Sequence, residues 1–338
     1  MEKSLERYSR QIRFSPIGEK GQLRLSEKSV LIVGIGALGT VLANHLVRAG
    51  VGLVRIVDRD YVEMSNLQRQ MLFDEKDVND SLPKAVAAEQ KLKLINSDVE
   101  IEAIVADVTV ETLPDLIEGI DLVLDGTDNF RTRFLLNDVC FKNGIPFAYG
   151  GAVSARGMSA LFIPGKTPCL RCFISQGEGT GQTCDTIGVI SPVVDIVASY
   201  QVIEVLKYLV GDEAALRGTL RSFDVWRNHQ FDLKMDSSKD GCPTCQLKEY
   251  PALVEEEDHV TTLCGRETVQ IQRSEKTDLK LWAKKLEKVA AVHNTPFLLR
   301  VQLDEGERLV LFPDGRVLVQ GTEDIARAKS LYSKYIGG

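Results

Sequence analysis

The chain has 338 residues, of which 44% are hydrophobic and 26% charged, and these values are ordinary for a soluble globular protein. The length exceeds that of a usual single domain, which predicts one large domain and one small one. A formal net charge of −7 argues against general nucleic-acid binding, and no apolar run reaches transmembrane length. The first residues, MEKSLERYSRQIRF, contain no apolar signal core, so we expect a cytoplasmic protein.

A polar N-terminal arm, expected to be helical over Tyr8–Leu25, precedes a short run rich in β-branched residues at Ser29–Val33. This run is typical of a strand that is buried on both faces. Three glycines in G-x-G-x-x-G spacing follow, namely Gly34, Gly36 and Gly39. The first two allow a tight turn and the close approach of a phosphate, and the third allows the next helix to pack on the strand.

The segment after these glycines completes a strand–loop–helix–strand unit. The predicted helix at Leu38–Ala49 points its N-terminal N–H groups at an anion. The next strand, Val54–Val57, leads to Asp58, where a carboxylate can accept hydrogen bonds from ribose hydroxyls. The pattern predicts nucleotide binding. The alternative is a doubly wound fold that binds no phosphate and keeps its glycines for packing.

Strands and helices alternate to about residue 150. The predicted elements are a helix at Pro83–Leu94, a strand at Val99–Val105, a helix at Val110–Glu118, a strand at Asp121–Asp125, a helix at Thr132–Asn143 and a strand that begins at Pro146–Tyr149. The alternation predicts a Rossmann-like α/β fold with a doubly wound, mostly parallel sheet. Such sheets bind ligands at the C-terminal ends of their strands. The glycine loop, Asp58 and Asp128 all fall at such ends, so we expect them to border one crevice.

An antiparallel extension of the sheet is predicted from Ala152 onward. The segment VSARGMSALFIP is typical of a hairpin, Ile196–Leu209 is a strongly apolar helix, and Ser222–Trp226 is a further strand. Between them, the glycine-rich run at residues 177–188 predicts a mobile loop.

The chain is expected to divide into two domains. Residues 1–246 form the nucleotide-binding domain, and residues 247–259 are interpreted as a linker because apolar periodicity stops and an acidic run begins. Residues 260–338 suggest a small α+β domain of order β-α-β-β-α. Its predicted helices lie around Leu279–Val292 and at Asp324–Tyr335.

Seven cysteines are present, and four of them form two C-x-x-C pairs, Cys169 with Cys172 and Cys242 with Cys245. In a reducing compartment this pattern favours metal or redox chemistry over structural disulfides. Each turn can present two thiolates to one tetrahedral ion, so the pairs predict a closed structural zinc site. The alternative is two unrelated redox or core pairs.

Cys184 stands apart in the glycine-rich run. A cysteine in a mobile, exposed segment can act as a nucleophile or sulfur acceptor. It can equally be a small residue that packs when the loop closes. Cys140 and Cys264 are expected in the core.

Asn66 and Arg69 lie just beyond Asp58, in the segment SNLQRQ. A dehydrogenase has no evident need for a guanidinium there, whereas charge that develops on a triphosphate during transfer is stabilised by a cation. Arg69 therefore shifts the interpretation from hydride transfer toward adenylation. Arg10 and Lys84 are further candidate cations, although any single Arg or Lys can simply be a solvated surface charge.

Asp128 lies in G-T-D-N after a buried strand, where a carboxylate can bind Mg²⁺. The alternative is a helix N-cap, a role that its neighbours in T-D-N would also fill.

These residues together resemble the ThiF/MoeB family, the bacterial relatives of ubiquitin-activating enzymes. The shared motifs are Arg10 in RYSRQI, the GIGALG loop, Asp58, SNLQRQ, Lys84, T-D-N at 127–129, both C-x-x-C pairs and Cys184. The resemblance covers about residues 5–246. The tail from about residue 260 resembles the extension of Bacillus-type ThiF proteins rather than a rhodanese domain, which favours the thiazole pathway.

The resemblance implies that the chain uses ATP to adenylate the C-terminal glycine carboxylate of a ubiquitin-like sulfur carrier of the ThiS type. Sulfur then replaces AMP to give a thiocarboxylate for thiamine thiazole biosynthesis. Further implications are Mg²⁺ as cofactor, a homodimer, a cysteine desulfurase as candidate sulfur donor, and no nucleic-acid or membrane partner.

The family also implies roles for residues at matching positions. The nucleotide-contacting set is Gly34, Gly36, Ala37, Gly39, Asp58, Ser65, Asn66, Leu67, Gln68, Arg69, Lys84, Asp128 and Asn129, with Asp58 on ribose, Asn66, Arg69 and Lys84 on phosphates and Asp128 on Mg²⁺. Arg10 is expected to reach across a dimer interface, and Cys184 matches the family cysteine of sulfur transfer. Two departures are noted: Ala37 replaces a common Gly, and the segment SLPK before Lys84 lacks a Gly found in relatives.

Several alternatives stay open. The chain can instead be an MoeB-type activator of the small subunit of molybdopterin synthase, or serve both pathways, and a cyclising tRNA-modifying relative is more distant. An NAD-dependent oxidoreductase and a non-catalytic scaffold are the alternatives from other classes. Loss of Arg69, Lys84 or Asp128 would have indicated the scaffold, and all three are present.

Overall fold

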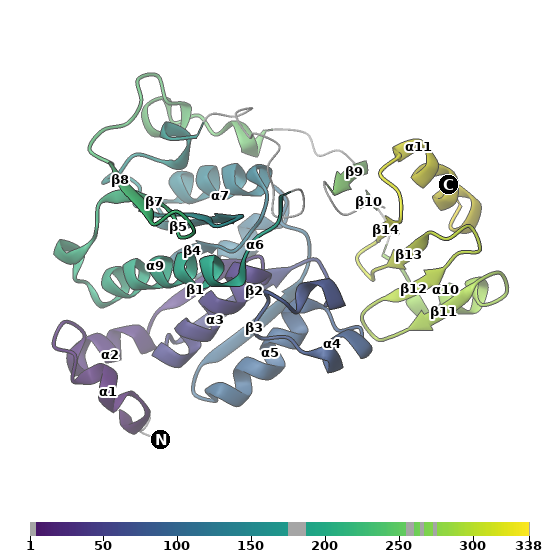
Figure 1. Cartoon of the computed structure of the whole chain (residues 1–338), viewed down its shortest axis with the longest axis horizontal. Helices are drawn as coiled ribbons and strands as arrows, with labels where there is room; N and C mark the ends of the chain where they lie inside the picture. Colours follow the sequence, from purple (N-terminus) through teal and green to yellow (C-terminus); the bar gives the residue numbers. More distant parts are fainter. Residues whose placement is uncertain (1–4, 175–186, 255–259, 264–266, 273–275, 338) are drawn as a thin grey trace. The chain divides into compact units, whose positions relative to one another are not determined.

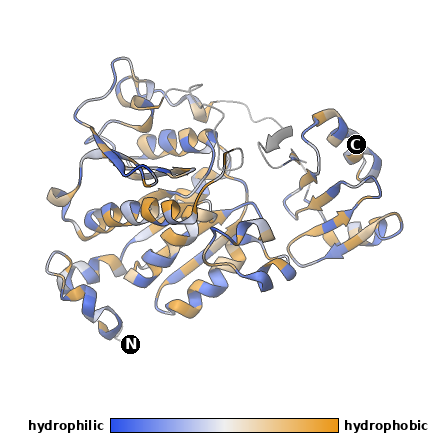
Figure 2. Ribbon diagram, in the orientation of Figure 1, coloured by the Kyte–Doolittle hydropathy of each residue, from blue (hydrophilic) through white to orange (hydrophobic). Residues whose placement is uncertain are grey.

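The structure is a computed structural model that describes residues 5–174, 187–254, 260–263, 267–272 and 276–337. The chain forms two compact units, Met1–Glu255 and Glu256–Gly338. Figure 1 shows the larger unit as a sheet between layers of helices. Figure 2 shows hydrophobic residues gathered on the strands and on helices such as α9 that pack against them.

The larger unit is built on an eight-stranded sheet of order β3-β2-β1-β4-β5-β6-β7-β8. Its strands are β1 Ser29–Val33, β2 Leu53–Asp58, β3 Glu100–Val105, β4 Leu122–Asp125, β5 Phe147–Val153, β6 Arg156–Phe162, β7 Thr219–Asp224 and β8 His229–Lys234. Strands β3, β2, β1, β4 and β5 pair in parallel, and β6, β7 and β8 continue the sheet antiparallel. This confirms the predicted α/β class, with a doubly wound sheet and an antiparallel extension.

Helices cover both faces of this sheet. They are α1 Ser9–Ile12, α2 Gly18–Ser26, α3 Ala37–Ala49, α4 Glu75–Asn79, α5 Lys84–Ile95, α6 Leu113–Ile117, α7 Phe130–Asn143 and α9 Ser191–Val210, with short turns η1 Leu5–Tyr8, η2 Met64–Asn66, η3 Leu170–Cys172, η4 Glu213–Ala215, η5 Pro243–Leu247 and η6 Pro251–Leu253. Helices α3, α5 and α9 share one hydrophobic cluster with the sheet, and α6 and α7 share the other.

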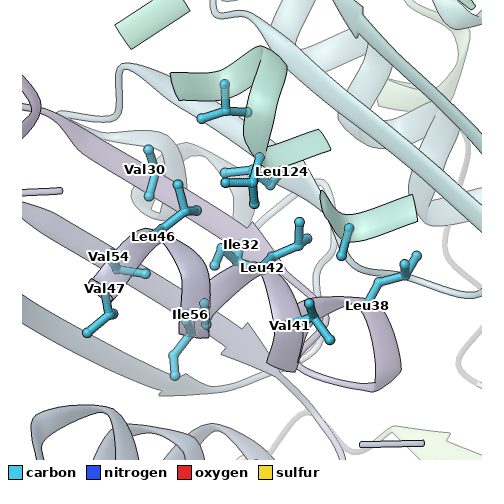
Figure 3. Packing of buried hydrophobic residues seen from close by; sticks show 14 of the residues in the cluster. Val30, Ile32, Leu38, Val41, Leu42, Leu46, Val47, Val54, Ile56 and Leu124 are labelled. Carbon is cyan, nitrogen blue, oxygen red and sulfur yellow. The ribbon is translucent and has the colours of Figure 1, made fainter. Parts of the chain in front are cut away.

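Strand β1 is buried on both faces because its side chains alternate between these two clusters. Val30 and Ile32 pack with α3, whereas Leu31 and Val33 pack on the side of α7. Figure 3 shows Ile32 beside Leu42 of α3 and Val30 beside Leu46 of the same helix. The continuous apolar run that predicted a doubly buried strand is thereby explained.

Several predicted boundaries shift. The apolar helix predicted at Ile196–Leu209 is α9, which begins earlier, at Ser191, because Pro192 is compatible with the first helical turn. The hairpin expected in VSARGMSALFIP is formed by β5 and β6. Helix α4 and strand β8 were not predicted, since α4 is very short and β8 is exposed along its length.

Residues 247–254 belong to the larger unit. Turn η6 follows the second C-x-x-C pair, and Ala252, which is buried, donates its N–H to Asp138 Oδ2 of α7 at 3.0 Å. The first compact unit accordingly extends to Glu255.

The smaller unit holds a six-stranded antiparallel sheet of order β11-β12-β13-β14-β10-β9. Its elements are β9 Val260–Leu263, β10 Thr268–Gln272, α10 Leu279–Leu286, β11 Ala291–Asn294, β12 Leu299–Gln302, β13 Arg308–Leu311, β14 Arg316–Gln320 and α11 Ile325–Tyr335. Helices α10 and α11 share one hydrophobic cluster with the sheet.

The helix predicted around Leu279–Val292 is wrong in its second half. Helix α10 ends at Leu286, and Ala291–Asn294 is strand β11, paired with β12 from Ala291↔Gln302 to Asn294↔Leu299. Pairing with a strand that comes later in the chain overrides the local helix preference. Strand β9 was also not predicted, and the observed order is β-β-α-β-β-β-β-α, with three strands more than the predicted β-α-β-β-α.

Among the helices that the structure describes, none combines the length and the apolar character needed to cross a membrane.

Candidate active site and metal centre

Two of the loop glycines are required by packing. Gly34 has a φ of +83°, and a Cβ there would lie 2.9 Å from the backbone of Gly126. A Cβ on Gly39 would lie 1.9 Å from Gly34 O. The glycine loop after β1 therefore presses directly against the loop after β4, and no larger residue fits at either position.

Gly36 differs, because its missing side chain leaves open space. A Cβ there would meet only Gln70 Nε2, at 3.7 Å. Gly36 is the N-cap of α3 and makes no side-chain cap, so the first-turn amides that begin at Ala37 receive no hydrogen bond from a capping side chain. Gln70 Oε1 is buried and has no hydrogen-bond partner among the described residues. A phosphate-bearing ligand fits such a cradle, since helix N-termini bind anions.

Asp58 ends β2 and fixes the glycine loop to it. Its Oδ2 accepts the Ile35 N–H at 2.8 Å, and its Oδ1 accepts the Asp60 N–H at 2.7 Å. Burial raises the pKa of Asp58, and the nearby positive charge of Lys84 opposes that rise. Each carboxylate oxygen can accept a second hydrogen bond, so both remain able to bind ribose hydroxyls.

Lys84 is buried at the first position of α5, only 4% exposed. Its Nζ forms an ion pair with Asp60 Oδ2 at 3.2 Å. The sequence analysis did not include Asp60 among the site residues. Its position two residues after Asp58, just beyond the end of a strand, could have indicated that it lies at the same edge of the sheet. The segment SLPK lacks a glycine found in relatives, but Lys84 still lies at this end of the sheet. Its backbone N–H also donates to Asp60 O.

The segment SNLQRQ forms turn η2 and the residues after it. Asn66 is buried and its Oδ1 accepts the Glu63 N–H at 3.1 Å, which fixes the turn. Arg69 is partly buried and its Nη1 donates to Ser65 O at 2.9 Å. Leu67 packs on the core, whereas Gln68 is exposed. The segment reaches the glycine loop through Gln70, beside Gly36.

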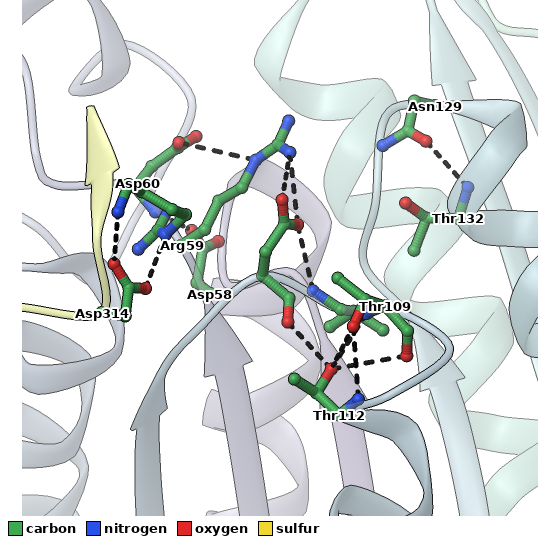
Figure 4. Close-up of polar contacts among 11 residues, drawn as sticks. Asp58, Arg59, Asp60, Thr109, Thr112, Asn129, Thr132 and Asp314 are labelled. Atoms are coloured by element: carbon green, nitrogen blue, oxygen red, sulfur yellow. Dashed lines mark hydrogen bonds and ion pairs between the residues drawn. The ribbon is translucent and has the colours of Figure 1, made fainter. Parts of the chain in front are cut away.

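The loop after β4 carries Asp128 and Asn129. Asn129 is the N-cap of α7, and its Oδ1 accepts the Thr132 N–H at 2.9 Å, as Figure 4 shows. Asp128 is exposed and lies within electrostatic reach of Arg133. Asn129, and not Asp128, is therefore the residue that caps α7.

A buried ion pair that the sequence did not predict lies under this loop. Arg133 Nε donates to Asp125 Oδ2 at 3.0 Å, and Arg133 Nη2 donates to Thr127 O at 2.7 Å and to Gly150 O at 3.1 Å. Asp125 Oδ1 also accepts the Thr127 N–H at 2.9 Å. Burial raises the pKa of Asp125, and Arg133 opposes the rise. The pair holds the backbone immediately before Asp128.

The loop after β3 is tied to the same strand edge. Arg59 Nη1 pairs with Asp107 Oδ2 at 3.0 Å (Figure 4). Thr112 Oγ1 then donates to Asp107 O at 3.0 Å and accepts the Thr109 N–H at 2.9 Å. Loops after β1, β2, β3 and β4 therefore meet at the C-terminal edge of the parallel strands.

Arg10 is not brought to this edge within one chain. It is exposed on α1, whose neighbour Gln11 donates to Ala49 O at 2.9 Å. Ala49 is the last residue of α3, and a helix of that length separates its ends by roughly 20 Å. Arg10 consequently lies near the opposite end of α3 from Gly36.

The four paired cysteines converge. Their Sγ atoms all lie within 4.8 Å of one another, with Cys169–Cys242 and Cys172–Cys245 each at 3.7 Å. Tetrahedral zinc with Zn–S of about 2.3 Å requires S–S separations of about 3.8 Å. The arrangement fits a single four-thiolate ion and contradicts two unrelated pairs.

Backbone amides point at the sulfur atoms of this cluster. The Cys169 N–H donates to Cys245 Sγ at 3.2 Å, and the Lys239 N–H donates to Cys172 Sγ at 3.4 Å. Such donors stabilise thiolates, the form that binds a metal.

Cys184 and Cys264 lie outside the described residues. Cys140 is fully buried in α7, as predicted, and burial raises the pKa of its thiol.

The fold and the site together define an α/β protein with a candidate nucleotide site and a separate four-cysteine cluster that could hold a metal ion. Residues 8–244 match the ThiF family, and the chain belongs to that family. It is 48% identical over 336 residues to the sulfur carrier protein ThiS adenylyltransferase of Bacillus subtilis (strain 168), covering 98% of this chain and 99% of that one.

A second relative matches a shorter part of the chain. The sulfur carrier protein ThiS adenylyltransferase of Escherichia coli (strain K12) is 38% identical over 240 residues, which is 71% of this chain and 94% of that one. The predicted likeness of the tail to Bacillus-type proteins is confirmed by the near full-length match. A crystal structure of E. coli MccB shares the fold, with a TM-score of 0.62 and 22% identity over 72% of this chain and 74% of that one.

Proposed function

We propose that this chain transfers AMP from ATP to the C-terminal glycine carboxylate of a ubiquitin-like sulfur carrier protein. The carboxylate oxygen forms a bond to the α-phosphorus, the bond between the α-phosphorus and the bridging oxygen breaks, and pyrophosphate leaves. The product is an acyl-adenylate, in which sulfur can then replace AMP. Both ThiS adenylyltransferases that match the chain support this adenylyltransferase assignment.

One observation of the structure carries the proposal. The open space at Gly36 is bordered by Gln70, the last residue of SNLQRQ, so the segment that carries Arg69 lies beside the N-terminus of α3. Phosphoryl chemistry uses such a cation because negative charge grows on the transferred group. Hydride transfer has no comparable use for it, which favours adenylation over the oxidoreductase alternative.

Within this proposal each site residue has a task. Asp58 accepts ribose hydroxyls, and the first-turn amides of α3 bind phosphate. Asn66, Arg69 and Lys84 contact the phosphates. Asp128 would hold Mg²⁺, which when bound neutralises charge on the reacting phosphates. The exposed position of Asp128, beside a cap already supplied by Asn129, supports this role.

Two residues act beyond the single-chain site in this proposal. Arg10 completes the site of a second copy in a homodimer, since its position on α1 is far from Gly36 of its own chain. Cys184 takes part in the sulfur step, with a cysteine desulfurase as sulfur donor. Carboxylate attack on ATP needs no thiol, so Cys184 is dispensable for adenylation.

The four-cysteine centre is proposed to hold structural zinc. Four sulfur ligands leave no open position, so the ion supports the fold and takes no part in the transfer. We place the reaction in the cytosol, where a reducing environment keeps these thiols free.

The thiazole pathway is the proposed context, because the near full-length relative is a ThiS adenylyltransferase. ATP–pyrophosphate exchange tests this when a ThiS-like carrier and the small subunit of molybdopterin synthase are offered separately. Exchange with the first carrier alone is expected. Exchange with the second alone would reassign the pathway, and exchange with neither would contradict the proposed reaction.

A further inference from the structure

A single buried carboxylate receives hydrogen bonds from three separate segments of the larger unit. Asp138 of α7 is fully buried. Its Oδ1 accepts Arg171 Nε at 2.9 Å and Thr244 Oγ1 at 2.8 Å, and its Oδ2 accepts Arg171 Nη2 at 2.7 Å and the Ala252 N–H at 3.0 Å. The Asn137 side-chain amide also donates, from Nδ2 to Asp138 Oδ1 at 3.0 Å, so five donors share the roughly four acceptor sites of this carboxylate.

The partners of Asp138 are the spacer residues of the two metal-binding turns. Arg171 lies inside the first C-x-x-C pair, and Thr244 lies inside the second. Asn137, the preceding residue of α7, adds a further link, because its Oδ1 accepts the Leu170 N–H of the first turn at 2.9 Å. The two turns are far apart in the chain, yet one helix binds both of them without using a cysteine.

We propose that Asp138 is a positioning residue for the zinc site, and that it joins the two C-x-x-C turns independently of the metal. The inference rests on the zinc assignment proposed above. When the turns are already joined, zinc binds four thiols that stand in place. Without this link the ion alone must order two distant segments, and the ordering entropy then lowers its affinity.

Asp138→Asn tests the inference, because it keeps the shape but removes the charge that pairs with Arg171. Partners outside the first coordination sphere of metal sites typically change metal affinity by about 10–100-fold. We expect zinc to be released to excess chromogenic chelator about ten times faster or more, with a matching loss of affinity in competition titrations. Zinc content of the unaltered protein is measured first.

Asp77→Asn is the matched control. Asp77 is also buried and also pairs with a cation, Lys91 Nζ at 2.7 Å, but it belongs to α4. This variant should lower the melting temperature and leave zinc release unchanged. Equal acceleration of zinc release in both variants would mean that Asp138 acts only through global stability, and would overturn the inference.

Thr244→Val provides a second variant in case Asp138→Asn does not fold. It removes one hydrogen bond to Asp138 and keeps the buried ion pair. We expect zinc release from this variant to be severalfold faster than from the unaltered protein. Unchanged release in Thr244→Val would overturn the link between turns. An unaltered protein without zinc would instead overturn the zinc assignment, and the positioning role with it.

Discussion

At the scale of single residues, the site depends on carboxylates whose surroundings assign them different tasks. Asp58 is partly buried and accepts the backbone N–H groups of Ile35 and Asp60, whereas Asp128 is exposed beside a completed helix cap. Asp60 serves a third purpose, because it forms the ion pair that holds buried Lys84.

The partial burial of Asp58 predicts a pH dependence of nucleotide binding. Burial raises its pKa, so on acidification it protonates at a higher pH than an exposed aspartate, whose pKa is about 3.9. A protonated Asp58 has lost acceptor capacity for ribose, so nucleotide affinity should fall as pH is lowered through this raised pKa. Titration calorimetry across pH should show the fall in the unaltered protein.

Asp58→Asn is the control for this measurement. The variant should bind nucleotide weakly at every pH and should not show the decrease in affinity that protonation of Asp58 causes. Protonation of the nucleotide itself affects both proteins alike. An identical pH profile in the two proteins would show that another group titrates.

Asp128 and Asn129 should separate function from stability. Asp128→Ala is expected to lower ATP–pyrophosphate exchange by about a hundredfold or more, the usual scale for a lost electrostatic contact at a reacting phosphate. Asn129→Ala removes the cap of α7 and should cost about 1 kcal/mol of unfolding free energy. Normal exchange in a folded Asp128→Ala protein would refute the metal-binding role.

At the scale of elements, α7 connects the two centres. The first turn of α7 contains Arg133, which pairs with Asp125 beneath the loop of Asp128. Further along the same helix, Asp138 accepts hydrogen bonds from residues of the two C-x-x-C turns. Helix α7 therefore fixes the position of the loop that contains Asp128 and of the two C-x-x-C turns.

Removal of the Arg133 charge should be costly. Arg133→Leu leaves buried Asp125 uncompensated, and breaking such a pair typically costs about 3–5 kcal/mol. Urea denaturation measures the loss. Arg221→Leu is the comparison, since the Arg221–Asp232 pair is partly exposed and such pairs contribute about 0–1 kcal/mol. Equal losses in the two variants would contradict a structural role for the buried pair.

At the scale of the whole molecule, the four-cysteine cluster joins two segments of the larger unit that are far apart in the chain, residues 169–172 and residues 242–245. Freshly purified protein should contain one zinc per chain, and Cys242→Ser should lose zinc and melt at a lower temperature, because a structural site contributes directly to folding. Metal analysis and thermal unfolding check both. Unchanged zinc content and melting temperature in Cys242→Ser would exclude the site.

The sequence by itself determined the features whose physics is local. The strand at Ser29–Val33, the glycine turn and the N-terminus of α3 follow from short-range sterics and from hydrogen bonding within about a dozen residues. Asp58 could be placed because it ends the very next strand. The C-x-x-C spacing likewise specified its own chemistry.

Only the tertiary structure decided which distant groups meet. The pairing of Ala291–Asn294 with β12 turned a predicted helical stretch into a strand. The Asp125–Arg133 pair, and the carboxylate of Asp138 between two cysteine turns, depend on where strands and helices pack. Charge pairing at these positions is set by burial, and burial belongs to the folded chain rather than to any local pattern.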